Sequence, residues 1–380
     1  MRSLVALALV ALLAAPAIAD DDFGGAYVIF ARGDSLLRTD PKGKSETQVA
    51  KLPTTAPVRA LRTDRAGKIL LANIGGKWAW MPLDGKATTF TELPCADGPA
   101  HLATDGSCVL CRGATSTTSL IINFATNKSI TIPIPATGAR IVGDTTNRRL
   151  VWADSAGVWS SPPNDPRKKT LVAPEAPLRG FLPNPAGTRA VGVYSDVIHD
   201  SLKTTKPAEL LMTFALDGQG ARRKTIKAGV VADWSYDNAW LLLQDRTNAC
   251  VVSASGGQYK CWKGYTTASI STDGKYALIL GSRDKAAAPT KDKKSSTKDK
   301  KSSQKDKKSS QKKDPDAEPS NESENRGDNE DELSDDVEVP LPTGNLSLYR
   351  ATLDGAYTTA PAKIISVLDG AAVWIPGPTP

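Results

Sequence analysis

The five cysteines and two histidines have the most distinctive chemistry in this 380-residue chain. Cys95, His101, Cys108 and Cys111 have the ligand types of a zinc site. Cys108 and Cys111 are three residues apart on an expected strand, however, so their side chains point to opposite faces. Export to an oxidising compartment, which we also expect, favours disulfides over metal binding. We therefore predict a Cys95–Cys111 disulfide, a free Cys108 and no metal, with zinc as the weaker alternative.

Cys250 and Cys261 form a second candidate pair. The residues between them predict a hairpin that turns at Ser255-Gly256. A two-residue turn makes the two cysteines direct cross-strand partners, at a separation that a disulfide can bridge. We expect a structural disulfide here, with two free thiols as the alternative.

His199 is the residue best suited to act as a general base, because Asp196 and Asp200 lie beside it in the sequence. These three residues would suit a hydrolase or lyase that acts on a carbohydrate or lactone. They fall in a long loop expected over 195–207, where a solvated histidine is the simpler interpretation. The sequence has no phosphate-binding glycine loop and no G-x-S-x-G turn. We therefore predict no catalytic residue, with this trio as the only alternative, and no cofactor.

The elements around these residues repeat about every 40 residues. Each unit has a short apolar segment, a tight turn of Asn, Asp or Gly, and a second apolar segment, with third and fourth segments after it. The segments are short and rich in β-branched residues, as strands are, and none outside the N-terminus has a helical apolar stripe. Four antiparallel strands per repeat are typical of propeller blades. The paired segments lie at 57–67 and 69–73, 99–106 and 108–111, 139–147 and 149–153, 178–187 and 190–194, 230–238 and 239–244, and 266–274 and 276–280.

The two ends of the chain together supply one further blade. Segments 26–31, 35–39 and 47–52 read as the second, third and fourth strands of a unit, and Ala371 to Pro376 reads as a first strand. Pairing the two ends would close the ring and remove an exposed sheet edge. We predict an all-β, seven-bladed β-propeller, with six or eight blades as the alternatives.

Several turns resemble those of TolB-like and WD40-like propellers, in which a W-S-x-D-G-x core precedes the second strand. The best matches are Trp234-Ser235-Tyr236-Asp237-Asn238 and Ser271-Thr272-Asp273-Gly274-Lys275-Tyr276. The resemblance is strong in only two or three units. It implies a fold and carries no function with it.

A highly charged segment over 284–340 interrupts the last repeat. It holds three copies of a lysine-rich seven-residue unit and then an acidic stretch, and it is too polar to bury a core, so we expect disorder. Lysine without interleaved aromatics would bind anionic surfaces without sequence specificity, so no specific nucleic acid is expected. The candidate binding lysines are Lys293, Lys294, Lys300, Lys301, Lys307 and Lys308.

The first 19 residues read as a signal peptide, with Arg2, an apolar run and Ala17-Ile18-Ala19 before an expected mature start at Asp20. No later run is long enough to span a bilayer. We therefore divide the chain into a leader (1–19), a propeller in two parts (20–283 and 341–380) and the insertion. We expect a periplasmic or secreted monomer that binds a protein or an anionic envelope polymer. The partner would bind the face carrying the 195–207 loop and the insertion.

Overall fold

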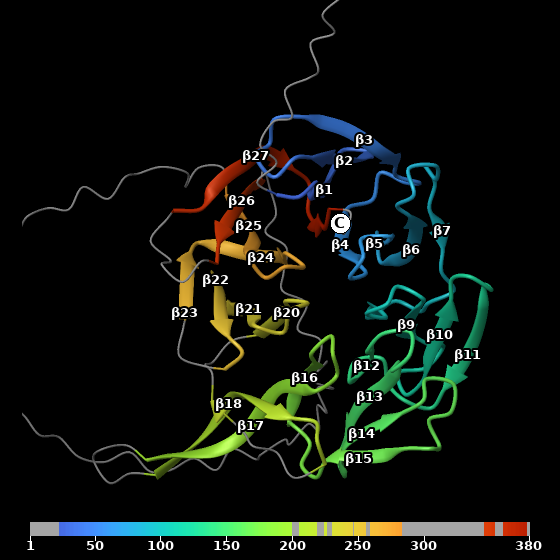
Figure 1. Cartoon of the computed structure of the whole chain (residues 1–380), viewed down its shortest axis with the longest axis vertical. Coiled ribbons are helices and arrows are strands. Elements are labelled where there is room, and N and C mark those ends of the chain that lie inside the picture. The colour runs from blue at the N-terminus through green and yellow to red at the C-terminus, as the bar shows by residue number, and fades with distance from the viewer. Residues whose placement is uncertain are drawn as a thin grey trace, which may run out of the picture. The chain divides into compact units, whose positions relative to one another are not determined.

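The computed structural model describes residues 23–199, 205–218, 224–225, 230–245, 247–255, 259–282, 346–353 and 360–377. Within these ranges the chain has strands and turns but no helix. Seven four-stranded antiparallel sheets are arranged as blades around a central axis (Figure 1). The predicted seven-bladed β-propeller is therefore confirmed. The described part holds no helix that could cross a membrane.

We number the blades in chain order, and the strands of each run outward from the axis. Blade 1 is β28-β1-β2-β3, and each later blade takes four successive strands, from β4–β7 in blade 2 to β24–β27 in blade 7. The strands are β1 Tyr27–Arg32, β2 Ser35–Thr39, β3 Glu46–Lys51, β4 Val58–Thr63, β5 Ile69–Ile74, β6 Lys77–Pro82, β7 Thr91–Glu92, β8 Ala100–Leu102, β9 Cys108–Arg112, β10 Ser119–Asn123, β11 Lys128–Ile132, β12 Ala139–Val142, β13 Arg149–Asp154, β14 Gly157–Ser161, β15 Thr170–Ala173, β16 Arg179–Pro183, β17 Arg189–His199, β18 Thr205–Ala215, β19 Lys224–Thr225, β20 Val230–Trp234, β21 Trp240–Asp245, β22 Asn248–Ser253, β23 Tyr259–Lys263, β24 Tyr265–Ile270, β25 Tyr276–Ser282, β26 Leu346–Thr352, β27 Ala362–Leu368 and β28 Ala372–Ile375.

The turn between the first two strands of a blade recurs with the same chemistry. In blades 6 and 7, the hydroxyls of Ser235 and Ser271 donate to the aspartate two residues on and accept the backbone N–H five residues on. The turn then needs a residue with positive φ, which glycine adopts at no steric cost. Asn238 has φ 63° at the place where Gly274 has φ 68°. In these two blades, side-chain hydrogen bonds within the turn thus place the second strand back on the first.

The ring closes by pairing its two ends. β28 pairs with β1 in antiparallel register, with Val28 opposite Trp374 and Phe30 opposite Ala372. The apolar core is divided among the interfaces between neighbouring blades, each with its own buried cluster. Large side chains fill these interfaces, as when Trp374 stacks on Tyr276 of blade 7 with ring centroids 5.3 Å apart. Closure by the terminal strands follows the prediction from the sequence.

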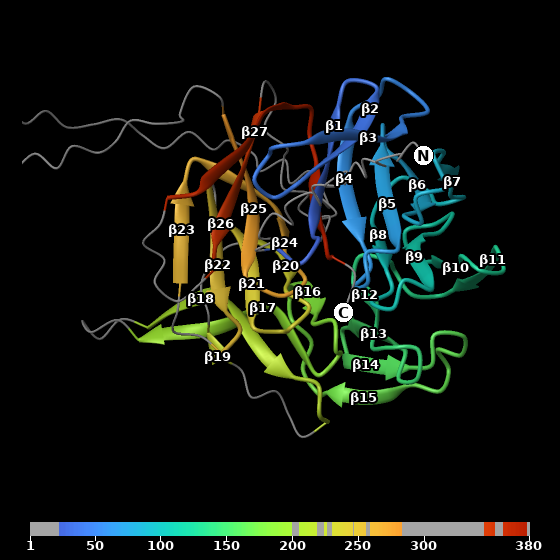
Figure 2. The same ribbon diagram turned by 45° about the horizontal axis from the view of Figure 1, so that its top comes forward.

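The prediction of a loop over 195–207 is wrong for most of that range, because 195–199 belong to β17 and 205–207 to β18. β16 and β17 last pair at Arg179 and Val193, but β17 and β18 continue to pair with each other as far as His199 and Thr205. Figures 1 and 2 show this hairpin extending beyond its sheet. Each strand satisfies the other's backbone hydrogen bonds, so the extension needs no third strand. Polar residues and Pro207 gave this segment the composition of a loop.

Both predicted disulfides are present. Cys250 and Cys261 are direct cross-strand partners on β22 and β23, with Cα atoms 4.1 Å apart. Cys95 and Cys111 link the connection between blades 2 and 3 to β9. Cys108 is a buried free thiol, whose pKa is raised by burial. The disulfide uses two of the four residues that the zinc alternative required.

Candidate functional site

The innermost strands of the seven blades are β4, β8, β12, β16, β20, β24 and β28, and they surround the axis (Figure 1). Side chains on such strands would be buried if the centre of the ring were filled. Arg59 and Arg62 of β4, Arg179 of β16 and Asp233 of β20 are instead exposed. The space between the innermost strands is therefore open to solvent, and we call it the central channel.

Polar residues from different blades share one level of this channel. Arg62, His101 and Asp233 each lie five residues before the positive-φ residue of their own turn. Equivalent positions in repeated blades lie at the same height around the axis. Arg140 of β12 adds a second arginine, whose charge acts on both His101 and Asp233. We call Arg62, His101, Arg140 and Asp233 the channel cluster.

His101 is buried and neutral. Its Nδ1 lies 3.0 Å from Nη1 of Arg62, and its side chain is 4% exposed. Burial, followed by the charges of Arg140 and Arg62, holds its pKa well below the usual value of 6.5. Because a guanidinium can only donate, Nδ1 accepts and the proton of the neutral ring sits on Nε2. Nε2 is buried and finds no hydrogen-bond partner among the described residues.

The two arginines of the channel cluster are held in place by the surrounding protein. The guanidinium of Arg62 lies over the Trp78 ring, 5.9 Å from its centroid. Nη1 of Arg140 donates to the backbone carbonyl of Ala139 at 2.8 Å and to that of Thr137 at 3.3 Å. Their positive charges are therefore fixed by contacts to the scaffold.

Asp233 is the carboxylate of the channel cluster. One oxygen accepts the backbone N–H of Trp234 at 2.8 Å. The side chain is open to the channel, but protein surrounds that narrow space, and this burial raises its pKa from 3.8 to about 6. The hydrogen bond and the charges of Arg62 and Arg140 act in the opposite direction and are outweighed. Asp233 therefore changes charge just below neutral pH.

Hydrogen bonds join different blades across the channel, at the end where turns connect the first and second strands of the blades. Tyr236 of blade 6 reaches to blade 2, where its hydroxyl donates to the carbonyl of Thr63 at 3.0 Å. Thr104 of blade 3 likewise donates through Oγ1 to the carbonyl of Pro185 in blade 5, at 3.2 Å. Burial raises the pKa of Tyr236, so its hydroxyl keeps the proton it donates. At the opposite end, before β16, Leu178 is 58% exposed.

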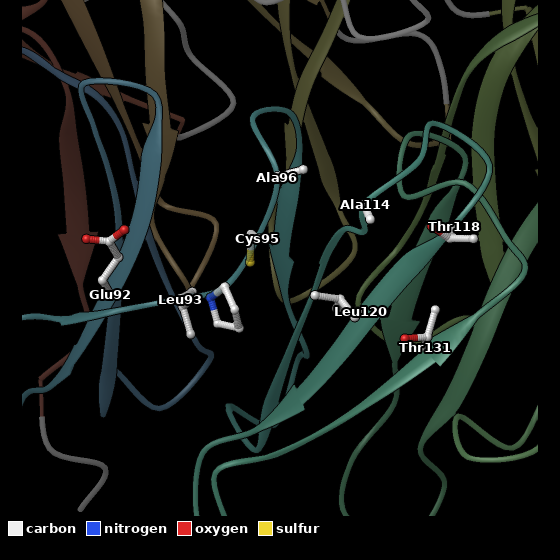
Figure 3. A pocket seen from close by; sticks show the side chains of 9 residues that line it. Glu92, Leu93, Cys95, Ala96, Ala114, Thr118, Leu120 and Thr131 are labelled. Carbon is white, nitrogen blue, oxygen red and sulfur yellow. The ribbon is translucent and has the colours of Figure 1, made fainter.

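A surface pocket of about 470 Å³ lies away from the channel cluster, between blades 2 and 3 (Figure 3). One wall is the connection from Glu92 to Ala96, held by the Cys95–Cys111 disulfide, and the other is formed by Ala114, Thr118, Leu120 and Thr131. The turn 113–118 joins the second and third strands of blade 3. The β17–β18 hairpin joins the same strands of blade 5. Pocket and hairpin therefore share the face where blades are linked, which we call the linker face.

The residues proposed from the sequence lie elsewhere. His199 and Asp196 are on β17, in the part of the hairpin beyond its sheet, where His199 pairs with Thr205. Asp200 and the six candidate lysines lie outside the described residues. His101, considered only as a zinc ligand, belongs to the channel cluster, and reasoning from the sequence missed Arg62, Arg140 and Asp233. The available signal was a column of polar residues at one position of the repeat, namely Arg62, His101 and Asp233; Arg140 lies outside it.

The ring of seven four-stranded sheets defines this chain as a seven-bladed β-propeller, which confirms the WD40-like resemblance at the level of the fold. Neither a family model nor a curated protein matches the sequence. Solved structures that match include the Cps50 (Swd1) β-propeller domain of Myceliophteria thermophila, at 11% identity over 68% of this chain and 93% of that chain, with a TM-score of 0.43. The Neurospora crassa Pan2 WD40 domain matches at 12% identity over 67% and 86%, with a TM-score of 0.39. A chain of a nidogen/laminin complex matches at 12% identity over 63% and 94%, with a TM-score of 0.42.

Proposed function

We propose that this protein is an exported binding module that captures a charged partner on its linker face. The observation that carries the proposal is the β17–β18 hairpin, which extends beyond its sheet and pairs only with itself past Val193. Elaborations that leave a repeat scaffold on one face are commonly its binding elements.

A second connection leaves the ring at the same face. β25 ends at Ser282 and β26 begins at Leu346, and these two residues pair with each other, so the intervening segment joins a second strand to a third. This is the type of connection that the hairpin makes in blade 5. The segment carries the lysines 293, 294, 300, 301, 307 and 308. The positive charges of these lysines favour an anionic partner, either an envelope polymer or an acidic protein surface.

The secretory leader and the disulfides support export as part of the proposal. Residues 1–19 have the composition of a signal peptide, and disulfides persist in oxidising compartments. Cell fractionation with N-terminal sequencing tests this part. A mature chain beginning at Asp20 in the periplasm or medium is expected, and an unprocessed cytosolic chain would contradict export.

Binding of an immobilised uronic-acid polymer at rising NaCl concentrations tests the partner class. The full chain should bind at low salt and release as salt rises, because phosphate- or carboxylate-directed lysine contacts are screened. A variant lacking residues 285–338 should bind more weakly, as should one in which Asn-Gly replaces residues 195–209. A control with the 162–169 connection shortened alters the opposite face and should bind normally. Equal binding by all four proteins would refute the proposed surface.

A further inference from the structure

The channel cluster is an unassigned site that the proposed function does not use. Two arginines face one carboxylate there, and the only histidine is neutral. No carboxylate of the described residues lies within ion-pair distance of Arg62, whose side chain is exposed to the channel. We propose that the central channel binds a small oxyanion, a carboxylate or phosphate group, between Arg62 and Arg140.

The geometry of Arg62 favours this ligand. One nitrogen of its guanidinium is engaged by His101 and its face rests over Trp78, which fixes the plane of the group. A planar guanidinium presents several donors in a rigid fork that matches the two oxygens of a carboxylate or phosphate. The exposed part of Arg62 therefore presents such donors to the channel. Because the guanidinium is already oriented, ligand binding has little further conformational entropy of Arg62 to lose.

His101 is a positioning residue for Arg62 and does not contact the ligand itself. It is buried, and it accepts a hydrogen bond from Arg62 only while its ring is neutral. Burial and the two arginines hold the pKa of His101 low, so the ring stays neutral across the physiological range. A neutral acceptor orients Arg62 and leaves its positive charge in place. A carboxylate in the same position would orient Arg62 but would also neutralise that charge.

Asp233 sets the pH dependence of the site. Arg62 from β4 and Arg140 from β12 act on it electrostatically, and it in turn raises the pKa of Tyr236 in the turn after β20. His101 contributes no charge. Below about pH 6 Asp233 is protonated, and its negative charge no longer offsets the positive charges of Arg62 and Arg140. An oxyanion should therefore bind more tightly as the pH falls through this range.

Hydrogen bonds favour one direction of approach for the ligand. Tyr236 and Thr104 make hydrogen bonds across the ring at one end, so we expect the ligand to enter from the other end, where Leu178 is exposed. The ligand can be a free oxyanion or an oxyanion group on a larger molecule, and the site would recognise the same group in both.

Isothermal titration calorimetry of the full chain with inorganic phosphate and with malonate at pH 7.5 tests the site. Binding of either probe is expected, and the two arms separate phosphate from carboxylate recognition. Arg62→Gln and Arg140→Gln should each weaken binding by roughly tenfold or more, because each removes a charged hydrogen-bond donor. Arg167→Gln makes the same charge change at an exposed position between β14 and β15 and should bind like the wild type. The inference is overturned if the wild type binds neither probe or if all three variants bind equally.

Asp233→Asn supplies a test that misfolding cannot imitate, because the expected result is a gain. At pH 7.5 it should bind several times more tightly than the wild type, since it removes a repelling charge. Sulfate, whose charge is constant between pH 5 and 8, is the probe for the pH series. Wild-type affinity for sulfate should fall as pH rises through about 6, whereas Asp233→Asn should show no such step. Parallel pH profiles would overturn the inference.

The variant lacking residues 285–338 should bind all probes normally, which separates this site from the linker-face proposal.

Discussion

Replacing Asp233 with asparagine is expected to stabilise the folded protein at neutral pH and to leave its stability unchanged in acid. The folded-state pKa of Asp233 is raised from 3.8 to about 6, so the fold binds its proton more tightly than the unfolded chain does. The stabilisation from the protonated form is complete below pH 3.8 and is lost as pH rises to about 6. Asparagine resembles the protonated form of aspartic acid at every pH, so the variant keeps this stabilisation as pH rises.

The size of the effect follows from the pKa difference and from the exposure of the side chain. A rise from 3.8 to about 6 corresponds to about 3 kcal/mol of unfolding free energy for a fully buried group. Asp233 is open to the solvent of the channel, and screening reduces this to roughly 1 kcal/mol. For a domain of this size, that gain corresponds to an increase in Tm of about 2 °C.

Denaturant unfolding of wild type and Asp233→Asn at intervals between pH 3 and pH 8 measures the difference directly. The two free energies of unfolding should coincide near pH 3, diverge as pH rises from about 4 to about 6, and keep a constant difference above that range. Asp34→Asn is the control, since the Asp34 carboxylate lies at the surface, where it pairs with Lys51 at 3.6 Å and accepts the hydroxyl of Ser35 at 3.0 Å, and its removal should change stability little at any pH. An offset between wild type and Asp233→Asn that stays constant over the whole pH range, or curves that coincide throughout, would refute the assignment of a raised pKa.

Three further substitutions test the scaffold. Tyr236→Phe removes a hydrogen bond across the ring and should lower the free energy of unfolding by about 1 kcal/mol, measured by denaturant unfolding. Gly106→Ala should cost roughly 1–3 kcal/mol, because φ is 71° there and a new Cβ would lie 2.8 Å from the side chain of Asp64; a Tm equal to that of the wild type would show that the turn adapts. Replacing both Cys250 and Cys261 with alanine should cost roughly 2–3 kcal/mol by relaxing the unfolded chain, and reduction of the wild type, which also breaks Cys95–Cys111, should cost at least as much.

The sequence predicted the fold because each blade repeats a local signal. Residues such as Ser271, Asp273 and Gly274 specify a turn through hydrogen bonds within a few residues, so they can be recognised without knowing the rest of the structure. The extended β17–β18 hairpin was missed for the opposite reason. Beyond Val193 its strands pair only with each other, and the sequence there has no regular apolar alternation.

The channel cluster could not be predicted from local patterns. Arg62 and Asp233 come from blades 2 and 6, far apart in sequence, and no local motif joins them. Only the closed ring brings them near each other, and only enclosure by the ring raises the pKa of Asp233. Aligning the repeats on their turns would have placed Arg62, His101 and Asp233 in one column. That column predicts a shared level in the channel, but the charge state of each residue depends on burial that the sequence does not give.

The pairing of β1 with β28 also constrains how the protein is made. β1 is among the first strands synthesised, and its partner emerges from the ribosome only after all the other blades. Until then, the edge of Tyr27–Arg32 has no neighbour on the axial side and can pair with another nascent chain. Contacts between such distant residues also form slowly. The docking of β28 should therefore be the slowest event of folding, and chaperones that shield the waiting edge should raise the yield of native protein.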